Sequence, residues 1–276
     1  MTAEHADPLA LRDLALSAAR EAAELVAARR RAGVAVAATK SSGTDVVTEA
    51  DRASEELLRR VLLTARPDDA VLGEEEGEAT GTSGVRWVVD PIDGTVNFLY
   101  GLPEYAVSVA AEVDGRVVAG AVVNAATGTA YDAALGHGAR RDGEALSVRD
   151  PAPVPHRLVL TGFSYEAHQR ALQADAVARM LPQVRDVRRM GACALDLCHV
   201  AEGSADGYLE EGTKAWDHAA GSLVVTEAGG RVGHHPGAGG RPLLLAAPAH
   251  GYDELLDLAA SCGFLAPAAA AAATRE

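Results

Sequence analysis

The chain has 276 residues, of which 48% are hydrophobic and 23% are charged, and its formal net charge is −14. This balance is typical of a globular protein with a sizeable core and excludes disorder for most of the chain. Acidic residues are in excess, and the chain has two lysines, Lys40 and Lys214. Direct binding to nucleic acid phosphates is therefore not expected. No stretch approaches the ~18 consecutive apolar residues of a membrane-spanning helix, so no membrane association is expected.

The cysteines and the N-terminal residues indicate the cellular compartment of the protein. The chain has three cysteines, Cys193, Cys198 and Cys262. Their odd number and the lack of a Cys-x-x-Cys pair argue against a disulfide framework and against a zinc site. The N-terminal segment carries acids among its apolar residues and lacks the basic start and apolar block of a secretory signal. These features predict a cytoplasmic protein.

In the first half of the chain, the spacing of apolar residues predicts two helices and then a series of strands. Apolar residues at three- and four-residue steps predict helices at 8–31 and 50–65. Two strand-like runs then flank Asp114-Gly115, a turn typical of a β-hairpin, and Asp142-Gly143 continues an antiparallel meander to about residue 150. The strands are expected at 85–89, 105–113, 116–124 and 129–134.

The segment Asp150–Pro155 holds three prolines in six residues and is the predicted boundary between two lobes, 1–150 and 151–265. After it, strands and helices alternate, which favours a smaller α/β lobe. Strands are expected at 157–163, 184–189, 207–210 and 243–247, and helices at 167–180, 192–202, 217–228 and 252–262. Residues 81–84 and 234–240 are expected to be loops, and the alanine-rich residues 266–276 a frayed tail.

Carboxylates are placed unevenly along the chain. In Asp90-Pro91-Ile92-Asp93-Gly94, a buried strand delivers Asp90 to the rim of the core, the proline stops the ladder, and the glycine permits a positive φ. Two carboxylates held this close repel each other unless a cation lies between them. Oxygen donors without cysteine or histidine select a hard ion such as Mg²⁺.

Each acidic motif taken alone also has a plainer interpretation. Asp90 could cap a helix while Asp93 is solvated, and the glutamates of 74–76 could form a solvated surface. Asp217 could be the N-cap of the helix that follows it, and Thr48 and Asp51 could cap the helix at 50–65.

Four motifs in one order make a more specific pattern between about residues 36 and 232. They resemble the inositol monophosphatase family of Mg²⁺-dependent, lithium-sensitive phosphatases. The motifs are Lys40-Ser41-Ser42 with Asp45, Val47, Thr48 and Asp51; Gly73-Glu74-Glu75; Asp90-Pro91-Ile92-Asp93-Gly94-Thr95 with Asn97-Phe98; and Trp216-Asp217 with Ala219-Ala220-Gly221. With the predicted elements, the resemblance implies an α+β, layered αβαβα sandwich: an antiparallel sheet lobe followed by a smaller α/β lobe, with the site between them.

The resemblance implies two to three Mg²⁺ ions. The first would be held by Glu74, Asp90 and the carbonyl of Ile92, the second by Asp90, Asp93 and Asp217, and a weaker third near Glu74 through water. Asp51, Glu74 and Thr95 are then the expected catalytic residues. Of these, Asp51 and Thr95 would orient and deprotonate a water that attacks phosphorus directly, without a covalent phosphoenzyme.

The resemblance also assigns contacts to a phosphate monoester. Glu210 would accept hydrogen bonds from ring hydroxyls, and Asp217 would contact a hydroxyl beside the phosphate. The full expected set for substrate is Asp93, Gly94, Thr95, Gly191, Ala192, Cys193, Glu210 and Asp217. These contacts favour myo-inositol 1-phosphate, although histidinol phosphate, fructose 1,6-bisphosphate and a 3′-phosphoadenosine nucleotide remain alternatives because the metal cage would be the same.

Some roles stay open at this point. Lys40 is either a residue of the weak metal site or a surface lysine, Cys193 either faces substrate or fills the core, and His218 is either packing or catalytic. The family is usually homodimeric, and a homodimer is expected. An alternative of another class is a protein partner in a bacterial transcription complex, since some bacterial relatives act in that way.

Overall fold

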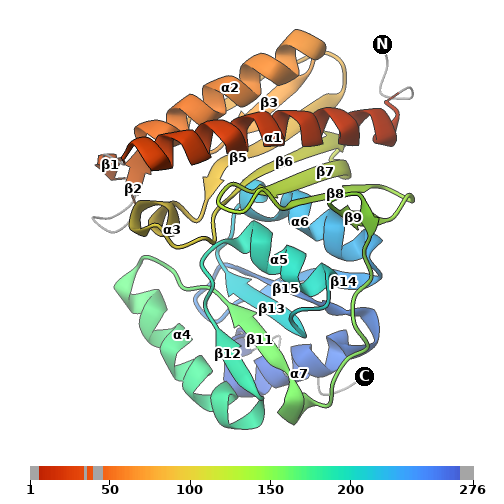
Figure 1. The fold of residues 1–276 in the computed structure, drawn as a ribbon. Coiled ribbons are helices and arrows are strands. Elements are labelled where there is room, and N and C mark those ends of the chain that lie inside the picture. The colour runs from red at the N-terminus through yellow and green to blue at the C-terminus, as the bar shows by residue number, and fades with distance from the viewer. Residues whose placement is uncertain (1–5, 34–35, 40–45, 268–276) are drawn as a thin grey trace.

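The computed structural model describes residues 6–33, 36–39 and 46–267, in which helices and strands stack in alternating layers (Figure 1). The first sheet has eight strands in the order β10-β9-β8-β7-β6-β5-β3-β4, and every neighbouring pair is antiparallel except β3 and β5. Its strands are β3 (Ala70–Gly73), β4 (Gly77–Ala79), β5 (Val85–Asp93), β6 (Ala106–Val113), β7 (Arg116–Asn124), β8 (Ala130–Ala134), β9 (Ala139–Arg141) and β10 (Glu144–Ala145). A separate hairpin joins β1 (Val36–Thr39) and β2 (Val46–Thr48).

Two helices cover the outer face of this sheet (Figure 1). The predicted helices appear as α1 (Pro8–Ala32) and α2 (Glu49–Ala65). Asp7 caps α1 by accepting from the Leu9 N–H, with Pro8 at the first helical position, where a missing N–H costs nothing. The apolar stripes of both helices pack with Trp87 of β5 and the neighbouring strands in one buried cluster.

A second pair of helices, α5 (Cys193–Ala201) and α6 (Ala215–Glu227), lies between the two sheets (Figure 1). One apolar cluster joins Val122 of the first sheet, Leu197 of α5, Val224 of α6 and Leu244 of the second sheet. The approach is close, because a Cβ added to Gly120 of β7 would lie 2.9 Å from the Cα of Ala220 in α6.

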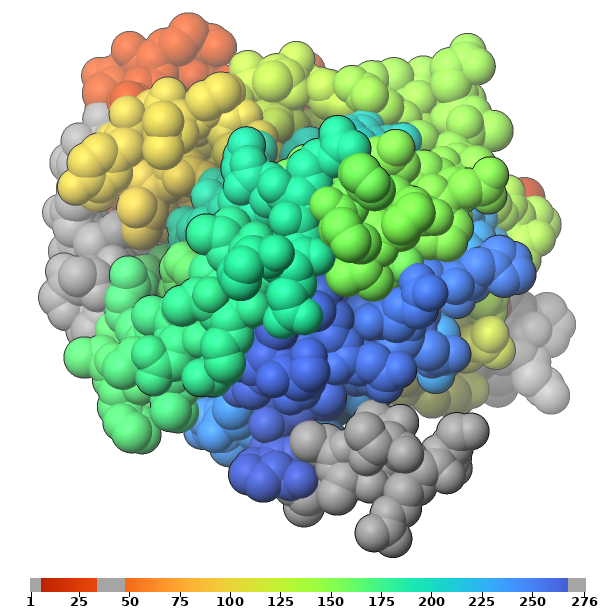
Figure 2. Space-filling view, turned by 90° about the horizontal axis from the view of Figure 1, so that it is seen from below, coloured from red at the N-terminus to blue at the C-terminus, as the bar shows by residue number. Residues whose placement is uncertain are grey.

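The second sheet has five strands in the order β12-β11-β13-β15-β14. They are β11 (Leu158–Thr161), β12 (Asp186–Arg188), β13 (Gly207–Glu211), β14 (Gly230–Pro236) and β15 (Pro242–Pro248). Helices α4 (Ala167–Met180) and α7 (Tyr252–Cys262) cover its outer face, seen in Figure 2 as green and blue atoms side by side. The predicted αβαβα order of layers is therefore confirmed. No helix among the described residues is long and apolar enough to cross a membrane.

Two sequence expectations were wrong in detail, and one short helix was not predicted. The loop predicted at 234–240 begins as the end of β14, an edge strand whose glycine, histidine and proline content hides its β-pattern. Strand β5 does not stop at Asp90 but continues to Asp93, because Pro91 lies within a break in register between Asp90 and Asp93 where no ladder bond is required. The six-residue helix α3 (Thr95–Tyr100) was too short to give a periodic signal.

Other expectations have no test in the described residues. Lys40, Ser41, Ser42 and Asp45 lie outside them, as does most of the predicted tail at 266–276. The division of the chain at residue 150 stays a prediction, since α5 and α6 pack against both sheets.

The close contact at Gly120 makes a stability prediction. Gly120→Val should lower the free energy of unfolding by about 1–3 kcal/mol, because α6 must move away from the first sheet to admit the side chain. Urea unfolding followed by circular dichroism would measure it. Arg116→Val, on the exposed end of the same strand, is the matched control and should change stability by less than about 0.5 kcal/mol; equal effects would contradict this account of the contact.

Candidate active site

A cavity of about 490 Å³ opens where the end of β5 in the first sheet faces the ends of elements from the second half of the chain. Its lining includes ten of the residues expected from the sequence: Glu74, Asp90, Ile92, Asp93, Gly94, Thr95, Gly191, Cys193, Glu210 and Asp217. The two others lie just behind the wall. Asp51 is fully buried beneath Thr95, and Ala192 is buried behind Gly94.

The turn 90–95 is fixed by its own backbone and by α5. The Ile92 N–H donates to Oδ1 of Asp90 over 3.0 Å, which holds that carboxylate at the break in the strand. Gly94 has φ +88°, a conformation that residues with a Cβ rarely adopt. The Ala194 N–H, in the first turn of α5, donates to Oδ2 of Asp93 over 2.6 Å. The turn is therefore attached to an element from the second half of the chain.

Asp51 serves as part of a helix cap and as a neighbour of the turn. Its Oδ2 accepts from the N–H of Thr48 (2.8 Å) and from the Thr48 hydroxyl (2.5 Å), completing a capping box on α2. Its Oδ1 lies 3.3 Å from Oγ1 of Thr95, which also lies 3.0 Å from the Ile92 carbonyl oxygen. The capping interpretation and the functional one are both compatible with this carboxylate, since its two oxygens have different partners.

Sequence reasoning missed the residue that holds the acidic turn after β3. The buried carboxylate of Glu55 accepts from the N–H groups of Glu75 (2.7 Å) and Glu76 (3.1 Å) and pairs with Arg59. A Cβ at Gly73 would lie 2.1 Å from Oε1 of Glu55, so glycine is required for this approach. Polar residues at the buried positions 51, 54 and 55 of α2, at helical spacing, were the available signal.

The opposite wall comes from β13 and the start of α6. Asp217 is the third residue of α6 and accepts from the Lys214 N–H over 2.6 Å, so it is part of the cap without being the N-cap itself. Oε2 of Glu210 accepts from the Tyr208 hydroxyl over 2.8 Å. Gly162 leaves room for this carboxylate, because a Cβ there would lie 1.6 Å from Oε2 of Glu210.

The acids of the two walls raise one another's pKa values. Burial raises the pKa of Asp93 well above its ordinary value, and the charges of Asp217, Glu210 and Glu74 raise it further. Burial, together with the charges of Glu74 and Glu210, raises the pKa of Asp217 to about 7 despite the hydrogen bond from Lys214. Burial also raises the pKa of Glu210. A cation among these groups would relieve this repulsion.

The donor set fits a hard divalent ion. Four carboxylates (Glu74, Asp90, Asp93 and Asp217) and the Ile92 residue line one cavity, and oxygen donors of this kind suit Mg²⁺. Within the described ranges, no three acidic, histidine or cysteine side chains already form a closed ion-binding group. The fit therefore lies in the chemistry of the donors that line the cavity.

Two residues left open by the sequence have clear surroundings. Cys193 lines the cavity, and burial raises the pKa of its thiol well above the usual value. The charges of Asp93 and Asp217 raise this pKa further. The His218 ring packs 4.9 Å from that of His234, and burial lowers its pKa to about 4, so it is neutral at pH 7. Neutral packing is the role these contacts favour for His218.

Comparisons with known proteins show which family the chain belongs to. The sequence pattern of the Inositol monophosphatase family matches residues 7–258. The chain is 47% identical to an inositol-1-monophosphatase of Mycobacterium bovis, covering 93% of this chain and 95% of the relative. It is 37% identical to the Nus factor SuhB of Escherichia coli K12, covering 82% and 85%. The solved structure of Mycobacterium tuberculosis SuhB superposes with a TM-score of 0.81 at 41% identity, over 94% of this chain and 99% of that one. The chain is thus a member of the inositol monophosphatase family, and an enzyme that hydrolyses phosphoric monoesters.

Proposed function

We propose that the protein hydrolyses myo-inositol 1-phosphate to inositol and phosphate with the help of two to three Mg²⁺ ions. The observation that carries this proposal is one cavity in which Asp90 and Asp93 of the first sheet face Glu210 and Asp217 from the second half of the chain. Members of the family are generally metal-dependent. When bound, Mg²⁺ would supply positive charge that offsets the phosphate oxygens and makes water more acidic.

The protein's own residues would handle the proton of the attacking water. Thr95 lies within reach of both Asp51 and the Ile92 carbonyl, so its hydroxyl can take a proton from water while passing its own to Asp51. The water oxygen forms a bond to phosphorus as the bond to the leaving alkoxide breaks, and the alkoxide takes a proton from solvent. The backbone N–H groups of Gly94 and Thr95 would orient the phosphate.

The leaving group would be selected on the other wall. Glu210 would accept hydrogen bonds from ring hydroxyls, Asp217 would contact the hydroxyl beside the phosphate, and Gly191, Ala192 and Cys193 would shape the contact surface. Without such hydroxyls the buried Glu210 carboxylate would be poorly satisfied, which favours a polyol.

Other phosphate esters are the alternatives to be tested. Histidinol phosphate and fructose 1,6-bisphosphate would use the same acids. A 3′-phosphoadenosine nucleotide gains support from the cavity lining, which also includes Phe163, Tyr165 and Arg189, side chains suited to stacking on a base. Phosphate release from the four esters at fixed Mg²⁺ would rank them.

A second function has support in the comparisons. One relative is named a Nus factor, and this chain is 37% identical to it. We therefore propose a transcription partner as the alternative role, tested by whether RNA polymerase components co-purify with the chain from lysate. The free, buried thiols of Cys193, Cys198 and Cys262 suit the cytoplasmic location that either role would have.

A homodimer is proposed on the basis of exposed apolar side chains. Tyr100 is 76% exposed and Leu102 is 55% exposed, two residues apart. Self-association would remove this area from water. Light scattering of the purified protein would give the oligomeric state.

The metal assignment predicts the effect of one change. Asp93→Asn should lower kcat more than about tenfold with the fold intact, because an amide is a poorer ligand for a divalent ion and one charge is lost. Steady-state kinetics with a circular dichroism check would measure this. Glu76→Gln is the control, since Glu76 is exposed and pairs with Arg59. Activity of Asp93→Asn above about a tenth of wild type would refute the assignment.

The polyol assignment predicts a substrate-dependent loss. Glu210→Gln should lower kcat/KM for myo-inositol 1-phosphate by about ten- to a hundredfold, because charged hydrogen bonds to hydroxyls are worth roughly 1.5–3 kcal/mol each. Hydrolysis of p-nitrophenyl phosphate, which has no such hydroxyls, should hardly change. Equal losses on both esters would instead make Glu210 a residue of the metal site or the fold. No loss on either would remove it from the site.

Lithium sensitivity is proposed from family membership and from the oxygen-only donors. Li⁺ at roughly tens of millimolar should inhibit turnover in an uncompetitive or mixed way, as a small hard cation competing for carboxylate oxygens. Initial rates across Li⁺ and substrate concentrations would show the pattern, with equal NaCl as the control. A rate unchanged by Li⁺ would contradict the proposal.

A further inference from the structure

Three chain segments meet at Gly94 with no room for a side chain. A Cβ at Gly94 would lie 2.9 Å from the carbonyl oxygen of Glu104 and 3.1 Å from that of Gly191. Residues 101–105, called here the bridging segment, connect α3 to β6 and supply the first contact. Residues 190–192, the substrate-side turn, precede α5 and supply the second. The walls of the cavity are thus joined at one crowded point.

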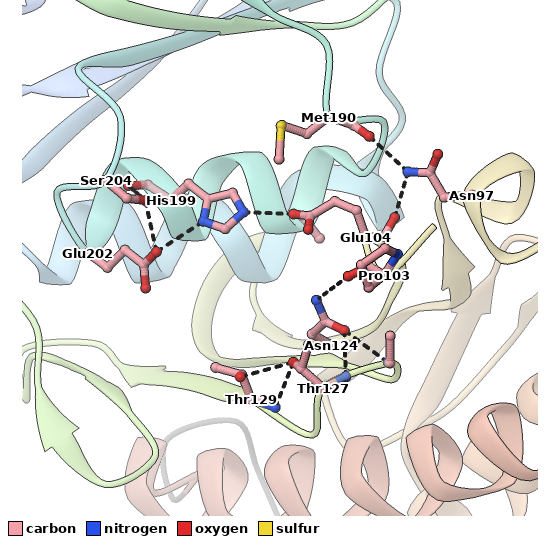
Figure 3. Close-up of polar contacts among 12 residues, drawn as sticks. Asn97, Pro103, Glu104, Asn124, Thr127, Thr129, Met190, His199, Glu202 and Ser204 are labelled. Atoms are coloured by element: carbon pink, nitrogen blue, oxygen red, sulfur yellow. Dashed lines mark hydrogen bonds and ion pairs between the residues drawn. The ribbon is translucent and has the colours of Figure 1, made fainter. Parts of the chain in front are cut away.

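Asn97 ties these segments together (Figure 3). Its Nδ2 donates to the carbonyl oxygen of Glu104 over 2.7 Å and to that of Met190 over 2.8 Å, which uses both amide hydrogens. The residue is 4% exposed, so the two bonds are shielded from water. Because Asn97 is the third residue of α3 and Gly94 is the N-cap of that helix, these bonds connect the turn 93–95 to the substrate-side turn.

The Glu104 side chain makes a second attachment, to α5 (Figure 3). Its Oε1 lies 2.7 Å from Nε2 of His199, whose Nδ1 lies 3.0 Å from Oε1 of Glu202. Burial alone would lower the pKa of His199, but the hydrogen bonds to the two carboxylates outweigh it and raise the pKa to about 10. The imidazolium is therefore charged at neutral pH, and the ion pair anchors the bridging segment to the helix that follows the substrate-side turn.

These contacts close a ring around the junction of the two walls. Asp93 is bonded to Ala194 at the start of α5, His199 further along α5 is paired with Glu104, and Asn97 joins Glu104 to Met190. Apart from Asp93, no member of this ring lines the cavity among the described residues. Displacements of about 1 Å in a reacting geometry can cost on the order of a hundredfold in rate, so a ring of this kind bears directly on turnover.

We propose that Asn97 and the Glu104–His199 ion pair are positioning residues, which hold the substrate-side turn against the turn 93–95 so that the leaving group meets its contacts while phosphorus meets the acids. The effect on leaving-group binding rests on the proposed function. The effect on the position of the substrate-side turn does not, and amide hydrogen exchange measures it separately.

The kinetic test compares two asparagines that hold the same bridging segment. Asn97→Ala should raise KM for myo-inositol 1-phosphate about tenfold and lower kcat less, since the loss of about 1.4 kcal/mol falls on leaving-group contacts. KM for p-nitrophenyl phosphate should change less than about threefold. Asn124→Ala is the matched control: its Nδ2 donates to the Pro103 carbonyl from the first-sheet side over 3.1 Å, and none of its bonds reaches the substrate-side turn. It should leave the ratio of the two KM values unchanged.

Amide hydrogen exchange measures the turn without reference to activity. In Asn97→Ala, exchange at residues 191–194 should be at least about tenfold faster than in wild type, and in Asn124→Ala it should be unchanged. If Asn97→Ala does not fold, His199→Gln cuts the ring at its other end and should give the same split in KM and the same faster exchange. Unchanged exchange in the folded variant, or equal KM changes on both esters with both asparagine variants, would overturn the positioning role. Faster exchange in a protein that hydrolyses neither ester would instead refute the proposed function and leave the positioning of the turn in place.

Discussion

The mutual repulsion of carboxylates buried in one cavity is the constraint that shapes this molecule. Burial and neighbouring negative charges raise the pKa of Asp93 and of Asp217, so the fold holds these groups against their tendency to separate. Each accepts from one backbone donor: Asp93 from the distant Ala194 N–H and Asp217 from the neighbouring Lys214 N–H. Because single backbone donors do not cancel the negative charges, a hard cation is the natural complement of the site.

Asp51 and Asp217 show that a helix-capping role and a role in the site do not exclude each other. Asp51 and Asp217 are each the third residue of a helix, where a carboxylate accepts from a backbone N–H one turn earlier. The cap uses one oxygen of each group, Oδ2 in both cases, and fixes the orientation of the other. For Asp51 that second oxygen faces the Thr95 hydroxyl. A local folding signal therefore also sets the geometry of the cavity.

The sequence predicted what depends on local periodicity and missed what depends on distant partners. Helix α4 was expected at 167–180 and is found there, because the three- and four-residue spacing of its buried residues 173, 176 and 180 is a local feature. Strand β14 was missed because its glycine- and histidine-rich residues form an edge strand only through pairing with β15. The acids came from motifs. Glu55 lay outside them, and Asn97 stood in one but was given no role, since their partners lie 20 and 93 residues away in the chain. The roles assigned to the site residues stay predictions until they are measured.

The two walls of the cavity are built in different ways, although the Ala194 N–H bonded to Asp93 ties them together. Asp90 and Asp93 lie in one strand, and their geometry follows from Pro91, Gly94 and a break in register. The opposite wall depends on contacts between segments that the middle layer of helices brings together, such as Asn97 with Met190. If the second set contacts the leaving group, as proposed, a change in it would alter which ester fits while Asp90 and Asp93 stay in place.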